Sequence, residues 1–113
     1  MAKTTWQIEL DYRSAIGKAK ELDNIANDLQ RNAFNKYQEV IEDLNVAWDG
    51  DNRIGYVNKL EEMKREVRKS IDNLRKIANS IRNIAEITRR AELEAARIAR
   101  ERSYGGGLGG GGW

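Results

Sequence analysis

The stretch Trp48-Asp49-Gly50-Asp51-Asn52-Arg53-Ile54-Gly55-Tyr56 lies between two long heptad-patterned segments that contain no proline. Glycine accepts a positive φ without Cβ strain and commonly follows the last turn of a helix. Gly50 therefore predicts the end of one helix, and Tyr56 provides an aromatic on the far side of the turn from Trp48. We predict that Trp48-Asp49-Gly50 is the tight turn of a helical hairpin, and that Tyr56 lies in its core.

The segment before this turn predicts one helix over residues 5–47. Thr4 and Gln7 have the spacing of a capping box, in which each side chain bonds the backbone amide of the other residue. Two columns of apolar residues then follow a seven-residue spacing along the helix. The first, beside Leu22 and Leu29, contains Ala19, Ala26, Ala33, Val40 and Ala47, and the second, on the adjacent stripe, contains Phe34, Ile41 and Trp48.

The segment after the turn predicts a second helix over residues 52–102. Two seven-residue columns form the a/d seam of a coiled coil. One contains Leu60, Val67, Leu74, Ile81, Thr88 and Ala95, and the other contains Met63, Ser70, Ile77, Ile84, Ala91 and Ile98. Ile71, Ala78 and Ala85 widen this seam into a broader apolar face.

The predicted fold is all-α, an antiparallel two-helix hairpin over residues 1–102 that dimerises into a four-helix bundle. Two helices packed only on each other leave part of such a wide apolar face in water, and a lone hairpin has little core. The residues predicted to meet a partner are Leu22, Leu29, Phe34, Ile41, Leu60, Val67, Leu74, Ile77, Ile81 and Ile84. Residues 103–113 are rich in glycine, whose ordering is costly, so we expect a flexible tail.

The two halves of the chain differ in charge. The chain carries 20 basic and 18 acidic residues in total. Up to Asp51 there are six basic and ten acidic residues, a net charge of −4, whereas the remainder has fourteen and eight, a net charge of +6. An acidic first helix lying against a basic second helix, in the same chain or in a second subunit, explains this asymmetry. Nucleic-acid binding by the second helix is the alternative, which its interleaved acidic residues and lack of aromatic residues disfavour.

The composition argues against an enzyme. The chain has no histidine or cysteine, so no side chain of these types titrates near neutrality, and no disulfide or zinc site is expected. Its glycines do not form a phosphate-binding loop. We therefore predict no catalytic residue, no metal and no cofactor, and the sequence shows neither a cleavable signal peptide nor a membrane-spanning segment.

With Trp48 and Gly50 between two long helices, and Tyr56 eight residues after the tryptophan, the chain resembles the WxG-motif family of small, Esx-like type VII secretion proteins. The resemblance covers residues from about 8 to 92. It implies a hairpin exported without a cleaved signal peptide from a cytoplasmic pool, with the secretion ATPase as a partner. It also implies a second subunit, which is either another copy, a related hairpin, or the helical N-terminal domain of a larger secreted effector.

Members of this family often carry Tyr-x-x-x-Asp/Glu near the end of the second helix, which is thought to cooperate with the turn motif in recognition by the secretion machinery. Glu92 stands at the acidic position in this chain, but Thr88 stands where the tyrosine is expected. The recognition elements that the resemblance implies are therefore Trp48, Gly50, Tyr56 and Glu92. A cytosolic coiled-coil scaffold, or a bundle associated with nucleic acid, remains the alternative function.

Overall fold

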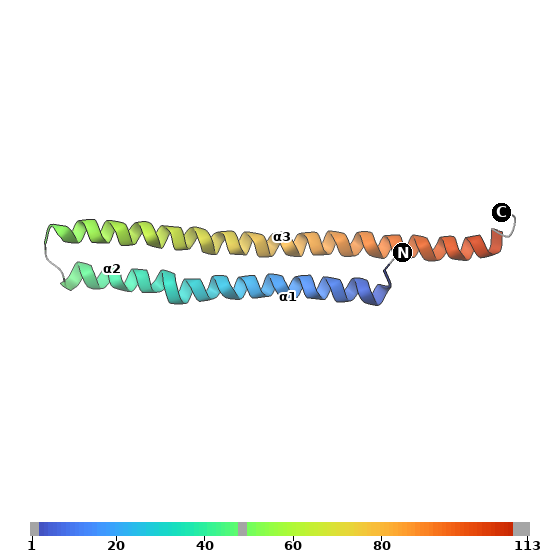
Figure 1. The fold of residues 1–113 in the computed structure, drawn as a ribbon, viewed down its shortest axis with the longest axis horizontal. Coiled ribbons are helices and arrows are strands. Elements are labelled where there is room, and N and C mark those ends of the chain that lie inside the picture. The colour runs from blue at the N-terminus through green and yellow to red at the C-terminus, as the bar shows by residue number, and fades with distance from the viewer. Residues whose placement is uncertain (1–2, 48–49, 110–113) are drawn as a thin grey trace. The chain divides into compact units, whose positions relative to one another are not determined.

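The computed structural model describes residues 3–47 and 50–109, and the side chains of those up to residue 102. Its elements are α1 (Thr5–Leu29), the π-helix η1 (Gln30–Phe34), α2 (Asn35–Ala47) and α3 (Asn52–Gly109) (Figure 1). The described residues form helices and no strands, which confirms the all-α prediction. Trp48 and Asp49 of the predicted turn, and residues 110–113 of the predicted tail, lie outside the described residues.

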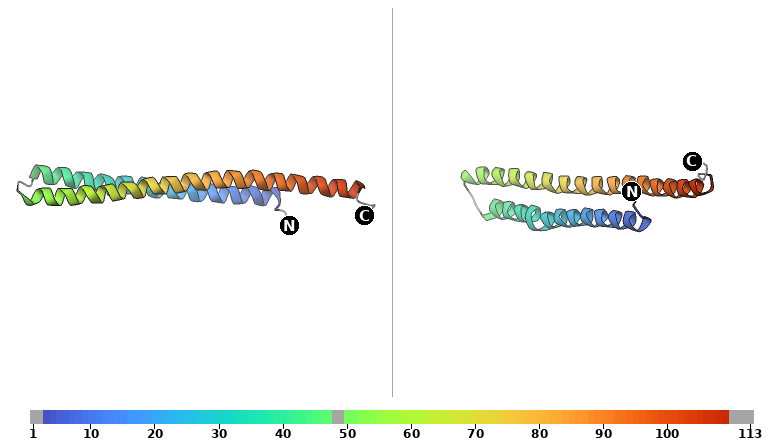
Figure 2. Two further views of the ribbon diagram at one scale, coloured as in Figure 1. Left: turned by 90° about the horizontal axis from the view of Figure 1, so that it is seen from above. Right: turned by 45° about the vertical axis from the view of Figure 1, so that its right-hand side comes forward.

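The chain divides into two compact units, each pairing part of the N-terminal helical segment with part of α3. Unit 1 comprises residues 1–19 and 80–113, and unit 2 comprises residues 20–79. In unit 2, α2 lies beside the beginning of α3 in every view of the ribbon (Figure 2). Two side-chain hydrogen bonds show that the paired helices of unit 2 are antiparallel. Arg75 Nη2 donates to Asn27 Oδ1 at 3.2 Å, whereas Lys64 Nζ, earlier in α3, donates to Gln38 Oε1, later in the N-terminal segment, at 2.6 Å. Unit 2 is therefore an antiparallel helix pair.

The first turn of α1 is closed by the predicted capping box. The backbone amide of Thr4 donates to Gln7 Oε1 at 3.0 Å, and the amide of Gln7 donates to Thr4 Oγ1 at 3.1 Å. These reciprocal bonds satisfy amides that have no partner within the helix. The capping box is confirmed, and α1 begins at Thr5, as predicted.

A π-helical segment lies within the helix that was predicted over residues 5–47. In η1 the backbone amide of Asn35 donates to the carbonyl of Gln30, five residues earlier, instead of to the residue four earlier. A π-helical turn takes up one more residue than an α-helical turn. The segment predicted as one helix over residues 5–47 is therefore helical from Thr5 to Ala47, and it contains a π-helical segment that was not predicted.

The buried seam of α3 lies one column away from the predicted a/d pair. Ile71 and Ala78 are completely buried and Ala85 nearly so, whereas Met63, Ile77 and Ile84 are exposed. Alanine allows a neighbouring helix to approach closely, so the column of Ile71, Ala78 and Ala85 forms the contact line. The column that contains Ile77 and Ile84 lies beside this line and is exposed. The residues expected to widen the seam are thus its centre.

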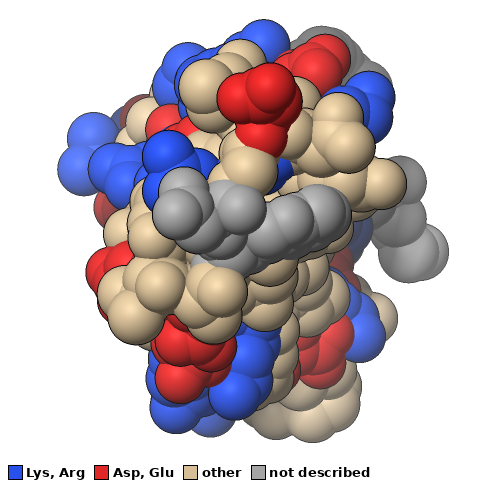
Figure 3. All heavy atoms as spheres, turned by 90° about the vertical axis from the view of Figure 1, so that its left-hand side faces the viewer, with Lys and Arg blue, Asp and Glu red and all other residues tan. Residues whose placement is uncertain are grey.

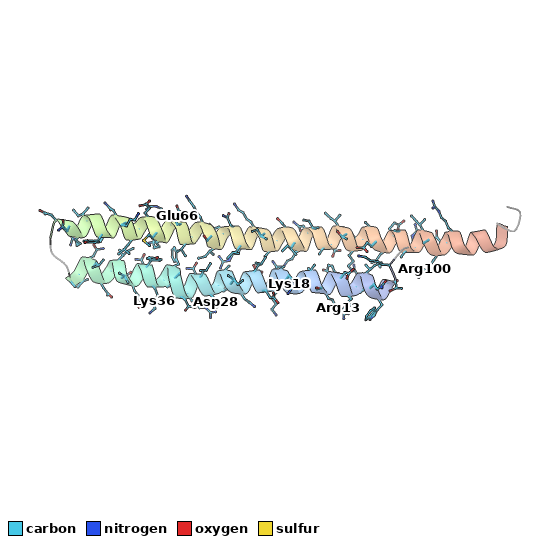
Figure 4. The ribbon with its side chains drawn as sticks, viewed as in Figure 1. Arg13, Lys18, Asp28, Lys36, Glu66 and Arg100 are labelled. Atoms are coloured by element: carbon cyan, nitrogen blue, oxygen red, sulfur yellow. The ribbon has the colours of Figure 1, made fainter. Side chains whose placement is uncertain are left out.

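Charged side chains occupy the outer faces of both helices in unit 2. Asp28 and Lys36 of the N-terminal segment, and Glu66 of α3, point away from the neighbouring helix (Figure 4). Each pairs with an oppositely charged residue one turn away on its own helix, and such exposed pairs contribute a few tenths of a kcal/mol. Acidic and basic side chains are interspersed at the end of unit 2 where α2 ends and α3 begins (Figure 3).

The helix α3 continues beyond its predicted end near residue 102 to Gly109. The sequence assigned residues 103–109 to a tail because of their glycines, and the structure gives their backbone a helical conformation. The flexibility expected for residues 103–113 stays a prediction.

Candidate interaction site

An open apolar groove of about 240 Å³ lies between α1 and α3 in unit 1. Ile8 and Ala85, both buried, belong to its lining together with Ala15. The alanine side chains are short, so they leave a space between the helices that larger residues would fill. The remaining lining residues are Asp11, Tyr12, Ile81, Ile84, Thr88, Arg89 and Glu92.

Arg89 and Glu9 form an ion pair across the two helices beside the groove. Arg89 Nη2 lies 2.9 Å from Glu9 Oε1, and Arg89 Nε donates to both carboxylate oxygens at 3.1 and 3.2 Å. The same guanidinium lies over the ring of Tyr12, 5.3 Å from its centroid, in a cation–π contact. The hydrogen bond to Glu9 raises the pKa of Arg89.

Lys3 connects the groove's two acidic residues. Lys3 Nζ lies 2.9 Å from Asp11 Oδ2 and 3.1 Å from Glu92 Oε2. Hydrogen bonds to Asp11 and to Glu92, in that order of size, raise the pKa of Lys3. Asp11, Arg89 and Glu92 are therefore each paired within the chain, and the apolar lining is what the groove offers to another molecule.

Among the described isoleucines of α3 in this unit, Ile84 and Ile87 are the most exposed. Ile84 lines the groove and is 64% exposed, whereas Ile87 is 65% exposed and does not line it. Isolated exposed apolar residues are ordinary on protein surfaces, but one that borders an apolar groove forms a larger contiguous surface. Ile84 and the groove together are the strongest candidate for an interaction site in the described residues.

The residues of the predicted turn motif are only partly described. The amide of Arg53 donates to the carbonyl of Gly50 at 3.1 Å, which closes the first turn of α3 on Gly50. Tyr56 is 56% exposed, so the prediction that it lies in the core is wrong. It stands on the outer side of α3 because Arg53 and Val57, its neighbours along the helix, occupy the inward positions. Trp48 lies outside the described residues, and its role in the turn stays a prediction.

Glu92 lies in unit 1 and is paired within the chain. Its side chain is 24% exposed and is paired with Lys3. Thr88, at the position where the tyrosine of the motif was expected, lines the same groove as Glu92 and Tyr12. The structure thus brings an aromatic ring and a carboxylate to one groove, with the ring supplied by α1.

The predicted partner-interface residues differ widely in burial. Ile41 is buried inside its own chain, whereas Ile77 and Ile84 are exposed. The others are partly buried between the two helices, and they are Leu22, Leu29, Phe34, Leu60, Val67, Leu74 and Ile81. Ile84 is the predicted interface residue that lines the groove while most of its surface stays accessible.

Tyr12 and the ion pair between Glu9 and Arg89 were not predicted from the sequence. The two charged residues are 80 positions apart, and nothing local in the sequence links them. Both helices carry many charges, so only the antiparallel alignment identifies which two meet. The position of Tyr12, four residues after the apolar Ile8, was the signal in the sequence that the two side chains share one face of the helix.

No group of histidine, cysteine, aspartate or glutamate that could hold a metal ion occurs among the described residues. Within residues 3–47 and 50–109, no helix combines the length and the apolar character that crossing a bilayer demands. Comparison with protein-family models, with curated proteins and with solved structures finds no match to this chain.

Proposed function

We propose that the protein acts by binding another helical protein through the groove of unit 1, as a small Esx-like hairpin of a type VII secretion system. The observation that carries the proposal is the apolar groove beside the exposed Ile84, bordered by charges that are already paired. An apolar side chain from a partner helix can fill this groove without leaving a buried charge unpaired. We propose no catalytic activity, metal or cofactor.

A small core inside the chain supports the need for a partner. Of the eight buried apolar residues found among those described, five are alanines and three are isoleucines. Alanine buries little apolar surface, and stabilisation scales with the area removed from water. A second hairpin would add the missing area, and we propose a four-helix bundle built from two copies, or from this chain and a related hairpin or effector domain.

The turn sequence supports the type VII assignment. Trp48 and Gly50 stand between two helical segments, as the resemblance requires, and the carbonyl of Gly50 closes the first turn of α3. We propose that Tyr12, held in the groove by Arg89, supplies the aromatic that Thr88 does not. In this proposal the chain is exported from a cytoplasmic pool without a cleaved signal peptide, after recognition by the secretion ATPase.

The interaction is tested by replacing Ile84 with Glu and measuring the solution mass by light scattering with helicity on the same sample. A charge at the groove should dissociate the dimer while helicity is retained, because Ile84 is not part of the chain's own core. Ile87→Glu is the matched control, since it changes the same residue type at the same exposure outside the groove. Equal effects of the two variants, or a parent chain that is a stable helical monomer and binds no helical partner, would refute the groove as the docking site.

The secretion role is tested separately by export assays. Trp48→Ala, Glu92→Ala and Tyr12→Leu should each reduce export, whereas Trp6→Ala, which changes an exposed tryptophan outside the groove, should not. Normal export of all three variants, with helicity intact, would leave an interaction protein with no recognition role for these residues.

The charge asymmetry favours one alternative function. The net charge of +6 from Asn52 onward would suit a helical bundle that associates with nucleic acid. Binding of a duplex DNA or RNA probe that weakens steeply between about 50 and 200 mM salt would support this alternative. Absence of binding at 50 mM salt would exclude it.

A further inference from the structure

The π-helix η1 lies at the point where the inward apolar column of the N-terminal segment changes. Before it, Ala26 is completely buried in unit 2, and after it Ile41 is 3% exposed. Ile41 follows Ala26 by fifteen residues, one more than two heptads, so the two residues belong to different columns of the sequence. Val40, which shares the column of Ala26, is 45% exposed.

The extra residue in η1 accounts for this change. A π-helical turn takes up one additional residue, and so it rotates the following helix by one position relative to an unbroken α-helix. Without η1, the column of Ala26, Ala33 and Val40 would face α3 throughout. With η1, the inward positions are taken by Phe34, the last residue of η1, and by Ile41 of α2.

Phe34 shows what the rotation achieves. Its ring lies under two cations of α3, with Lys64 Nζ 5.4 Å and the Arg68 guanidinium carbon 5.6 Å from the ring centroid. Lys64 also donates to Gln38 on the next turn of α2. These contacts and the burial of Ile41 hold α2 in the π register.

We propose that η1 is a register switch. In the state described, Phe34 at the end of η1 and Ile41 of α2 face α3. When η1 closes into an α-helix, α2 turns by one residue and presents Val40 in their place. The sequence carries an apolar column for each state, and π-helical segments occur frequently at functional sites. The switch lies within unit 2 and does not depend on the proposed secretion role.

The test uses thiol labelling, which is clean because the chain contains no cysteine. In single-cysteine variants, the thiol of Val40→Cys should react at least roughly tenfold faster than that of Ile41→Cys, because buried positions react only through local opening. Adding Ile41→Ser to Val40→Cys removes the apolar anchor of the π register. The thiol at position 40 should then become protected by about the same factor, with helicity retained.

Deleting Asn32, an exposed residue of η1, provides the second test. The deletion removes the extra residue, so Ala26 and Ile41 fall into one heptad column and η1 becomes α-helical; the thermal midpoint should stay the same or rise. In this background, Ile41→Ser should lower the midpoint and leave the thiol at position 40 reactive, because no second register remains. Deleting Glu66, an exposed residue of α3, is the matched control and should lower the midpoint strongly.

Three outcomes would overturn the proposal. The first is a deletion of Asn32 that is as damaging as the deletion of Glu66. The second is a Val40→Cys/Ile41→Ser chain whose thiol reacts as fast as that of Val40→Cys alone. The third is a Val40→Cys/Ile41→Ser chain that loses its helicity, because α2 would then have no alternative register to adopt.

Discussion

The two units differ in the side chains that are buried between their helices. In unit 2, Ile41 and Ile71 are buried, and Phe34 is covered by two cations of α3. In unit 1, the buried residues found among those described are Ile8 and three alanines, and an apolar groove remains open between the helices. The comparison indicates that unit 2 supplies most of the stability of the hairpin, whereas unit 1 leaves apolar surface for a partner.

The largest expected effect separates the buried isoleucines of the two units. Ile71→Ala should lower the free energy of unfolding by about 2 to 5 kcal/mol, because it creates a cavity at a completely buried site. Ile8→Ala should cost less globally, because α1 can open locally near its first residue, and it should mainly reduce hydrogen-exchange protection in residues 5–19. Urea denaturation and hydrogen exchange measure the two effects. Equal global losses would contradict the proposed division between the units.

The second effect concerns the aromatic rings of the two units. Phe34→Leu keeps an apolar side chain but removes two cation–π contacts, so it should cost about 1 to 2 kcal/mol in urea denaturation. Tyr12→Leu removes only the contact with Arg89 and should cost roughly half as much. A larger loss for Tyr12→Leu would mean that unit 1 depends on its aromatic more than unit 2 does.

A third and smaller effect is expected at the first turn of α1. Thr4→Ala removes the hydroxyl that accepts the amide of Gln7 and should cost about 0.5 to 1 kcal/mol. The loss should appear as faster amide exchange in the first turn of α1 and leave unit 2 unchanged. Thr4→Ser, which keeps the hydroxyl, is the control and should behave like the parent.

The smallest effect is the pH dependence of unit 1. Hydrogen bonds to Asp11 and Glu92 raise the pKa of Lys3, so their stabilisation is complete below the ordinary lysine pKa and is lost as the pH rises through the raised value. The start of α1 should therefore loosen only at strongly alkaline pH, as measured by fluorescence anisotropy of a variant that keeps Trp6 as its single tryptophan. Lys3→Met should remove this transition.

The acidic counterpart lies at Glu94. A hydrogen bond from Arg97 lowers the pKa of Glu94, so this stabilisation is present above the ordinary glutamate pKa and is lost as the pH falls through the lowered value. A carboxyl NMR titration should show Glu94 titrating higher in Arg97→Gln than in the parent. An unchanged midpoint would show that the ion pair does not form in solution.

The sequence predicted the features of the fold that depend on local chemistry. The capping box of Thr4 and Gln7, the helical character of both segments and the break between Ala47 and Asn52 follow from residue types at fixed spacings. The π-helix was not predicted. Its signal was the presence of two columns offset by one residue, which an unbroken helix accommodates only by exposing one of them.

The candidate site depended on contacts that local patterns do not define. The seven-residue spacing placed Ile84 in an apolar column, but this spacing does not determine which residues of the other helix contact it or how exposed it is. The groove is lined by Ala15 and Ala85, which are 70 positions apart in the sequence. The expectation that Tyr56 is buried failed for a related reason, since the seam of α3 passes one column away from the predicted pair.

The antiparallel pairing has a consequence for folding kinetics. The sequence separation of paired side chains is 26 for Gln38 with Lys64, 48 for Asn27 with Arg75 and 80 for Glu9 with Arg89. Closing a short loop costs less entropy than closing a long one, so the contacts nearest the turn form at the lowest cost. Folding should begin in unit 2 and reach unit 1 last, and mechanical or thermal unfolding should proceed in the opposite direction.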